Sequence, residues 1–293
     1  MADERDVQAL HTTCDCPDTA GDFHLDRRTV IGCGLAVSAG IAGSMALQRL
    51  LPLDSGVEPD DLAPIAKAYD AETAQLTFIV DSSKCIGCGL CVAACKEENR
   101  IPSETKYNRT WIERHVVTSD GTVHVDSPDA GINGFGAVSM APGIAGKRVD
   151  AAYFAPRLCM QCENPPCVPV CPVSATYATP EGVVLIDETR CIGCGYCVTA
   201  CPYGARYVIP SGSDTPLGIS GVADKCTWCF HRITRGLEPA CVEVCPVGAR
   251  QFGNAADPDD PIQASLNQLP TPLWPEYGTK PRLLYLGPVT EEA

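Results

Sequence analysis

The apolar positions of the chain form one long run near its start and many short runs further on. The long run covers residues 29–48, contains no charged side chain and has the length of a helix that spans a membrane. Two short runs, Phe78–Asp81 and Val184–Asp187, are typical of strands, and a tight group of cysteines follows each of them. Helical patterns at 92–98 and 198–200 follow those groups. The order of strand, cysteine loop and helix predicts a duplicated α+β unit.

The segment between the first two cysteine groups adds a predicted hairpin. Residues 111–117 alternate like a strand, residues 119–121 favour a turn, and residues 122–125 return. Residues 130–146 are rich in Gly and Ala, and we expect a surface loop there. After the last group, residues 254–293 carry repeated Pro and Asp with little periodicity, which predicts an irregular, extended C-terminal tail.

The long apolar run follows a polar leader that ends in paired arginines, Arg27 and Arg28. This order is typical of a twin-arginine export signal. Residues 44–46 (Ser-Met-Ala) offer a spacing that a signal peptidase accepts, so cleavage near Leu47 and retention as a membrane anchor both stay open. A buried core helix is the alternative, but a Gly-rich stretch behind a polar leader makes a poor core helix.

The charge of the chain excludes one class of function. Its 36 Asp and Glu residues outnumber its 22 Lys and Arg residues, which gives a formal net charge of −14. An acidic chain is repelled by a phosphate backbone, and aromatic residues make up only 6% of the sequence, so we expect no nucleic-acid binding. The 19 cysteines change the picture more, because only Cys14, Cys16 and Cys33 lie outside four tight groups.

Sixteen cysteines form candidate metal ligands. The four groups are Cys85, Cys88, Cys91, Cys95; Cys159, Cys162, Cys167, Cys171; Cys191, Cys194, Cys197, Cys201; and Cys226, Cys229, Cys241, Cys245. The first and third groups have the spacing C-x2-C-x2-C-x3-C, whereas the second has a wider middle gap and the fourth has an insertion after its second member. Three closely spaced cysteines can surround one iron–sulfur cubane, while the fourth, placed on a helix, reaches a neighbouring cluster. Four ligands per cluster then predict four [4Fe–4S] clusters.

Two other uses of many cysteines fit this spacing less well. A disulfide framework is common in exported proteins, but C-x2-C-x2-C brings three thiols too close together for bridges to distant partners. Zinc ribbons use separated C-x2-C pairs rather than repeated triplets with a fourth member. Export also suits the cluster interpretation, because the twin-arginine route carries folded proteins that received their clusters in a reducing compartment.

Four stretches carry a resemblance to a known family. They are CIGCGLCVAACKEEN (85–99), PRLCMQCENPPCVPVCP (156–172), CIGCGYCVTACPYGARY (191–207) and, with a gap, KCTWCFHR (225–232) and PACVEVCPVGAR (239–250). The chain resembles the four-cluster [4Fe–4S] electron-transfer subunits that accompany molybdopterin oxidoreductases and related membrane complexes. That family includes dimethyl sulfoxide and polysulfide reductase subunits and ferredoxin-like subunits associated with nitrite and sulfite reduction. The resemblance covers residues 76–253.

This resemblance implies crossed ligation, in which three cysteines of one group and the last of another bind each cluster. The implied sets are Cys85, Cys88, Cys91 with Cys245; Cys226, Cys229, Cys241 with Cys95; Cys159, Cys162, Cys167 with Cys201; and Cys191, Cys194, Cys197 with Cys171. It also implies an α+β fold with two bacterial-ferredoxin-like, βαβ-type units in a pseudo-twofold arrangement. The expected organisation is a twin-arginine signal or membrane anchor at 1–46, a linker at 47–75, the first half of unit 1 with its β insertion at 76–150, unit 2 at 151–217, the second half of unit 1 at 218–253 and the tail at 254–293.

The resemblance finally implies an electron-transfer subunit of a membrane-associated respiratory complex and not an enzyme. Electrons would pass between a catalytic molybdopterin or multihaem cytochrome subunit and an integral-membrane quinone-interacting subunit, in the periplasm or at the outer face of the cytoplasmic membrane. An enzyme in its own right is the second hypothesis, but the sequence has no glycine fingerprint for a nucleotide and only five His, of which His231 follows a cysteine. A redox sensor, the third, would need an output domain that the pattern does not provide.

Overall fold

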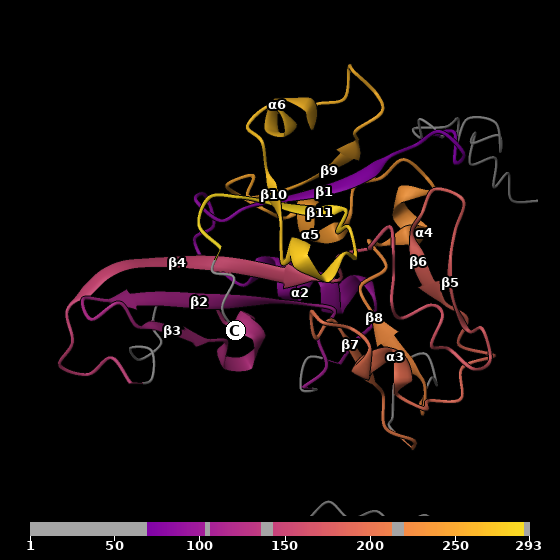
Figure 1. Ribbon diagram of the computed structural model, residues 1–293, viewed down its shortest axis with the longest axis horizontal. Helices are drawn as coiled ribbons and strands as arrows, with labels where there is room; N and C mark the ends of the chain where they lie inside the picture. The colour runs from indigo at the N-terminus through magenta and orange to yellow at the C-terminus, as the bar shows by residue number, and fades with distance from the viewer. Residues whose placement is uncertain (1–68, 103–105, 136–142, 213–219, 290–293) are drawn as a thin grey trace, which may run out of the picture. The chain divides into compact units, whose positions relative to one another are not determined.

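The computed structural model describes residues 69–102, 106–135, 143–212 and 220–289, all within the unit Pro64–Ala293 (Figure 1). The predicted export signal at 1–46 and most of the predicted linker lie outside the described residues. Small helices and strands are mixed along the chain, in agreement with the α+β prediction. In chain order they are β1 (Leu76–Asp81), α2 (Leu90–Glu98), β2 (Thr110–Thr118), β3 (Val123–Asp126), η1 (Pro128–Gly131), β4 (Val149–Leu158), β5 (Thr176–Ala178), β6 (Val184–Ile186), α3 (Tyr196–Thr199), β7 (Arg206–Val208), β8 (Ala223–Lys225), α4 (Phe230–Ile233), α5 (Ala240–Glu243), β9 (Arg250–Asn254), α6 (Gln263–Leu266), β10 (Thr271–Pro272), η2 (Pro275–Tyr277) and β11 (Leu283–Leu286).

Strand β1 lies inside a four-stranded sheet with the order β10-β11-β1-β9. All six of its residues are buried, because apolar side chains cover both of its faces. Phe78 and Val80 belong to the main core, whereas Ile79 packs with Ile262 and Leu286 on the other face. A strand that is covered on both sides has a continuous apolar run, which explains why the sequence shows no alternation there.

The C-terminal residues correct one prediction, because they are not an irregular tail. Strand β11 pairs in parallel with β1, with Phe78 opposite Leu283, and β10 pairs with β11 in turn. Leu283 is fully buried and Tyr285 nearly so. The apolar run that forms β11 is only four residues long and stands among Pro-rich turns, so its periodicity is hidden in the sequence.

The insertion between the first two cysteine groups forms a three-stranded sheet with the order β3-β2-β4, which is drawn below the four-stranded sheet in Figure 1. The predicted hairpin corresponds to β2 and β3, and β4 pairs antiparallel along the whole of β2. Strand β4 runs through the predicted boundary between residues 150 and 151. The hairpin of β7 with β8 likewise joins the two sides of the predicted boundary at 217/218. Backbone hydrogen bonds therefore cross both of these predicted boundaries between units.

The described part of the predicted surface loop at 130–146 also differs from expectation. Gly131, Phe135 and Ile144 are buried. A Cβ atom on Gly89, whose φ is +83°, would lie 2.4 Å from the backbone oxygen of Ile132. The glycines on both sides thus let this segment pack directly against the first cysteine loop, and a Gly-rich composition here reflects close backbone approach rather than exposure.

Candidate metal centres

The first cysteine loop and the end of the fourth group meet around one cavity. We name it site 1, and its cysteines are Cys85, Cys88, Cys91 and Cys245. Strand β1 delivers the loop, and α2 begins within it at Leu90. Gly87 and Gly89 adopt positive φ values of +65° and +83°, which allow the backbone to curl around the cavity. The structure therefore brings together three cysteines of one group with the last cysteine of a group about 150 positions away.

Two more cavities repeat this arrangement in the second and third groups. Site 3 is lined by Cys159, Cys162, Cys167 and Cys201, and site 4 by Cys191, Cys194, Cys197 and Cys171. Sites 1, 3 and 4 thus have the same ligand set, three cysteines of one group and the last cysteine of another. The repeated ligand set indicates sites built for the same kind of group.

The remaining four cysteines gather between α2 and α5, and we name them site 2: Cys226, Cys229, Cys241 and Cys95. The pKa of Cys95 lies well above its usual value. Burial is the largest cause, and the neighbouring thiols of Cys226, Cys241 and Cys229 add to it. The side-chain amide of Asn99 lies 3.6 Å from the Cys95 sulfur. The structure thus places each of the sixteen predicted residues in a group of four, and these groups have the same membership as the predicted sets.

The donor set suits an iron–sulfur cluster better than the two alternatives. All sixteen described cysteines are free thiols, so no disulfide forms among them. Within the described residues, no three His, Cys, Asp or Glu side chains come close enough together to bind a single metal ion. A structural zinc needs four ligands about 2.3 Å from one point. Four thiols placed around a common site, too far apart to share one metal ion, instead fit a multi-iron group, which supplies one-electron redox chemistry when bound.

Backbone N–H groups point at several of the sulfur atoms. Ala175 donates to the Cys171 sulfur at 3.2 Å, Ala223 to that of Cys191 at 3.3 Å and Trp228 to that of Cys226 at 3.3 Å. Burial alone would raise the pKa of the Cys171 thiol, but N–H donors of the following turn lower it. At Cys171 these donors therefore favour thiolate sulfur, the form that binds iron.

Other thiols are held in surroundings that resist ionisation without a metal. Burial raises the pKa of Cys85 to about 11 and that of Cys162 to about 12. Burial is also the main cause that raises the pKa values of Cys226 and Cys241, and neighbouring thiols add to the rise. Iron replaces the proton on such a ligand, so binding of a metal and folding of these loops are coupled.

Three buried cations beside the sites were missed at the sequence level. Arg250 and Arg206, at the starts of β9 and β7, are 2% and 4% exposed, and Lys225 in β8 is fully buried. Arg250 lines site 1 and Arg206 lines site 3. The Lys225 ammonium donates to the backbone oxygens of Val184 at 2.5 Å and Cys226 at 2.9 Å. The repeated strings CPYGAR and CPVGAR were a signal for the two arginines.

Two residues within the fourth group have supporting roles. Trp228, a spacer between two ligand positions, is 1% exposed and packs its ring near Phe78 and Phe252 in the core. His231 pairs with Glu98 at 2.6 Å, and its side chain is 46% exposed. His231 therefore ties α4 to the end of α2 at the surface.

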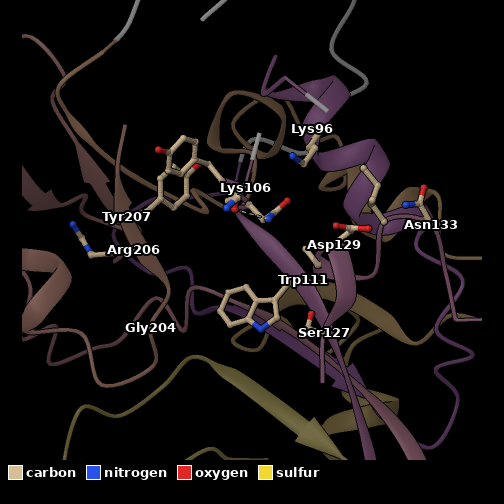
Figure 2. A pocket seen from close by; sticks show the side chains of 13 residues that line it. Lys96, Lys106, Trp111, Ser127, Asp129, Asn133, Gly204, Arg206 and Tyr207 are labelled. Carbon is tan, nitrogen blue, oxygen red and sulfur yellow. Dashed lines mark hydrogen bonds between the residues drawn. The ribbon is translucent and has the colours of Figure 1, made fainter. Parts of the chain in front are cut away.

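A further cavity of about 870 Å³ lies beside these sites (Figure 2). Lys96 of α2, Trp111 of β2 and Tyr207 of β7 contribute to its lining, and the Tyr207 ring stacks on Tyr107 with centroids 5.2 Å apart. No cysteine lines it, but Arg206 lines both this cavity and site 3.

Comparison with known proteins decides the family. Two family models of the 4Fe–4S dicluster domain match residues 84–175 and 150–255. A tetrathionate reductase subunit of Salmonella typhimurium is 39% identical over 253 residues, which cover 82% of this chain and 86% of the relative. A polysulfide reductase subunit of Wolinella succinogenes is 37% identical over 209 residues, which cover 70% and 91%. A dimethyl sulfoxide reductase iron–sulfur subunit of Halobacterium salinarum is 38% identical over 220 residues, which cover 72% and 78%.

This protein belongs to the 4Fe–4S dicluster iron–sulfur subunit family of tetrathionate, polysulfide and dimethyl sulfoxide reductase complexes. As an iron–sulfur subunit, it transfers electrons and is not itself catalytic, which confirms that prediction. Two dicluster domains with sixteen cysteines correspond to four [4Fe–4S] clusters, which confirms the predicted cofactors. The iron–sulfur subunit thus consists of two ferredoxin-like dicluster domains built from small helices and strands.

Proposed function

We propose that this iron–sulfur subunit relays electrons between a catalytic molybdopterin or multihaem cytochrome subunit and an integral-membrane quinone-interacting subunit. Sites 1 to 4 each bind one [4Fe–4S] cluster with the four cysteines that define the site. One observation carries the proposal: sites 1, 3 and 4 are each lined by three cysteines of one group and the last cysteine of another. Crossed ligation of this kind ties neighbouring clusters to the same short helix.

Helix α2 illustrates how the relay is kept short. Cys91 near its start belongs to site 1, and Cys95 one turn later belongs to site 2. Two residues four positions apart on an α-helix are separated by about 6 Å along its axis. Sites 1 and 2 therefore share a rigid connection, which suits direct transfer of an electron between the two clusters. The same spacing joins Cys197 with Cys201, which belong to sites 4 and 3.

The two ends of the relay are open to apolar surface. Cys88 of site 1 and Cys194 of site 4 are exposed, whereas the other described cysteines are buried or half-buried. Ile86 and Leu90 beside site 1 are 55% and 48% exposed, and Ile192 and Tyr196 beside site 4 are 63% and 62% exposed. Exposed apolar side chains gathered over a redox centre are typical of a docking surface for a partner protein. We assign one redox partner to each end.

The proposed location is the periplasm or the outer face of the cytoplasmic membrane, after export by the twin-arginine route. The support is Arg27 and Arg28 ahead of the uncharged run at 29–48. In the part of the chain that the structure describes, none of the helices is long and apolar enough to cross a membrane.

We further propose that the first and fourth cysteine groups belong to one dicluster unit and the second and third groups to the other, in a pseudo-twofold arrangement. The equivalent positions of Arg250 and Arg206 support this proposal.

Substitution of one apolar residue at each end tests the two-partner relay. We expect Ile86→Asp to abolish capture of one partner from detergent-solubilised membranes, and Ile192→Asp to abolish capture of the other, because a charge is introduced into an apolar contact. Leu269→Asp is the matched control, since Leu269 is 83% exposed and lies in neither patch. Purified variants should retain the full iron and acid-labile sulfide content. Unchanged capture of both partners by both variants would refute the docking assignment.

A further inference from the structure

Two arginines occupy equivalent places in the repeated sequence. Each follows the last cysteine of a group by five positions, in CPYGAR (201–206) and CPVGAR (245–250). Arg206 is the first residue of strand β7, and Arg250 is the first residue of strand β9. Each strand begins after the turn that follows a ligand, and its first residue places the guanidinium near the sites. Both side chains are almost completely buried.

One threonine hydroxyl anchors each arginine and leaves part of the guanidinium without a partner. Arg250 donates from Nη2 to the Thr110 hydroxyl at 2.7 Å, while its Nε and Nη1 are buried without a hydrogen-bond partner. Arg206 donates from Nη1 to the Thr176 hydroxyl at 3.3 Å, while its Nη2 is buried without one. Buried donors are almost always satisfied, and both guanidinium groups interact with a neighbouring thiol, Arg250 with Cys241 and Arg206 with Cys197, so these N–H groups indicate sulfur as their acceptor. Cluster and thiolate sulfur are suitable acceptors.

Each arginine lies between two sites of the relay. Arg250 lines site 1 together with Cys85 and Cys91, and its charge also acts on Cys241 of site 2. Arg206 lines site 3, and its anchor Thr176 lines site 4. One guanidinium therefore faces both sites of each pair.

The charge of these arginines is not balanced by a carboxylate. In the described residues, other buried arginines have acidic partners, such as Arg109 with Asp224 and Arg157 with Glu113. Neither Arg206 nor Arg250 forms such an ion pair there. An arginine stays protonated even when buried, so each places a full positive charge in a poorly screened region.

We propose that Arg250 sets the reduction potentials of the clusters at sites 1 and 2, and that Arg206 sets those at sites 3 and 4, by raising them. The inference rests on the proposed ligation. A cubane with four thiolates gains one negative charge when it accepts one electron, so a fixed cation nearby stabilises the reduced form. A shared cation also weakens the repulsion between two reduced neighbours. The arginines thus keep both clusters of a pair reducible by the same donor.

Redox titration of the purified full-length protein, followed by electron paramagnetic resonance, tests the proposal. The wild-type protein should show four one-electron midpoints. In Arg250→Gln two of them should fall, each by at least tenfold in the reduction equilibrium, which corresponds to about 59 mV. In Arg206→Gln the other two should fall. Arg250→Lys and Arg206→Lys, which keep the charge, should shift them less. Arg114→Gln is the matched control, because Asp126 balances that charge, and it should shift none.

The outcomes separate this proposal from the proposed function. Gln variants that retain all iron and sulfide but shift no potential overturn the role of the arginines, as does a shift of the same two clusters in both variants. If the Gln variants contain less than the full amount of iron and sulfide, the Lys variants decide between charge and shape. A full iron and sulfide content in the Lys variants supports the need for a positive charge. An incomplete content in the Lys variants as well means that only the shape of the arginine matters, which overturns the proposal. A wild-type protein without acid-labile sulfide would overturn the ligation itself, before any variant is measured.

Discussion

At the scale of single residues, the thiols of neighbouring sites alternate along the chain. Cys241 and Cys245 stand four positions apart on and after α5, yet the first belongs to site 2 and the second lines site 1. Removing one thiol should therefore damage the cluster of a distant group and spare the cluster bound by its sequence neighbours. This expectation separates crossed ligation from the simpler arrangement in which each group holds its own cluster.

The substitution Cys245→Ser tests the crossing. We expect loss or conversion of the cluster at site 1, whereas the cluster at site 2 keeps all four ligands. Iron and sulfide analysis should fall by up to about a quarter, the share of one cluster in four, and the electron paramagnetic resonance spectrum should lose one component.

Cys88→Ser is the matched comparison for that experiment, because Cys88 lines the same site from the other group. It should remove the same spectral component as Cys245→Ser, and Cys241→Ser should remove a different one. If Cys245→Ser and Cys241→Ser lost the same component, each group would bind its own cluster and the crossed assignment would be wrong.

At the scale of elements, the C-terminal strand completes the sheet that delivers the first cysteine loop. Strand β11 lies beside β1 with Leu283 opposite Phe78. Without β11 one edge of β1 would lose its hydrogen-bond partners and its apolar cover. The last strand of the sheet therefore supports site 1, although it contains no ligand.

The substitution Leu283→Ala tests this support. Leu283 is fully buried, so we expect a loss of about 2–5 kcal/mol in the free energy of unfolding, from lost transfer energy and the cavity left behind. Anaerobic thermal unfolding of the loaded protein measures it. Leu269→Ala, at a position that is 83% exposed, should change the stability by less than about 0.5 kcal/mol. Equal stability of the two variants would contradict a structural role for β11.

At the scale of the whole molecule, local signals indicated the candidate ligands but not the sheet that carries the first cysteine loop. Cysteine spacing is a local pattern with a strong chemical meaning, so the sixteen candidate ligands could be predicted without knowledge of the fold. Strand β11 could not, because its pairing with β1 joins residues about 200 positions apart and its run is only four residues long. Arg206 and Arg250 are a third case. The repetition of these two arginines is visible in the sequence, but their proposed role follows only from their burial beside the cysteine thiols.

The core itself is arranged around the cysteines. The main apolar cluster includes Cys91, Cys159, Cys226 and Cys241 together with Phe78 and Trp228. Because many of the cysteine loops have little regular structure, the apolar contacts alone give limited stability to those loops. Bound clusters join segments that are far apart in sequence, as disulfides do in small proteins. The fold of this iron–sulfur subunit should therefore depend on its metal.

Removal of iron tests that dependence. We expect anaerobic treatment with an iron chelator to bleach the visible absorption and, in the same time course, to expose the core, detected as tryptophan fluorescence moving to the red when the buried Trp228 ring meets water. Iron and sulfide added back under reducing conditions should restore both signals. The same protein incubated with a calcium-selective chelator, which leaves the iron bound, is the control for chelator effects. If absorption vanished while tryptophan fluorescence and the unfolding temperature stayed unchanged, the polypeptide would hold its fold without clusters, and the coupling would be refuted.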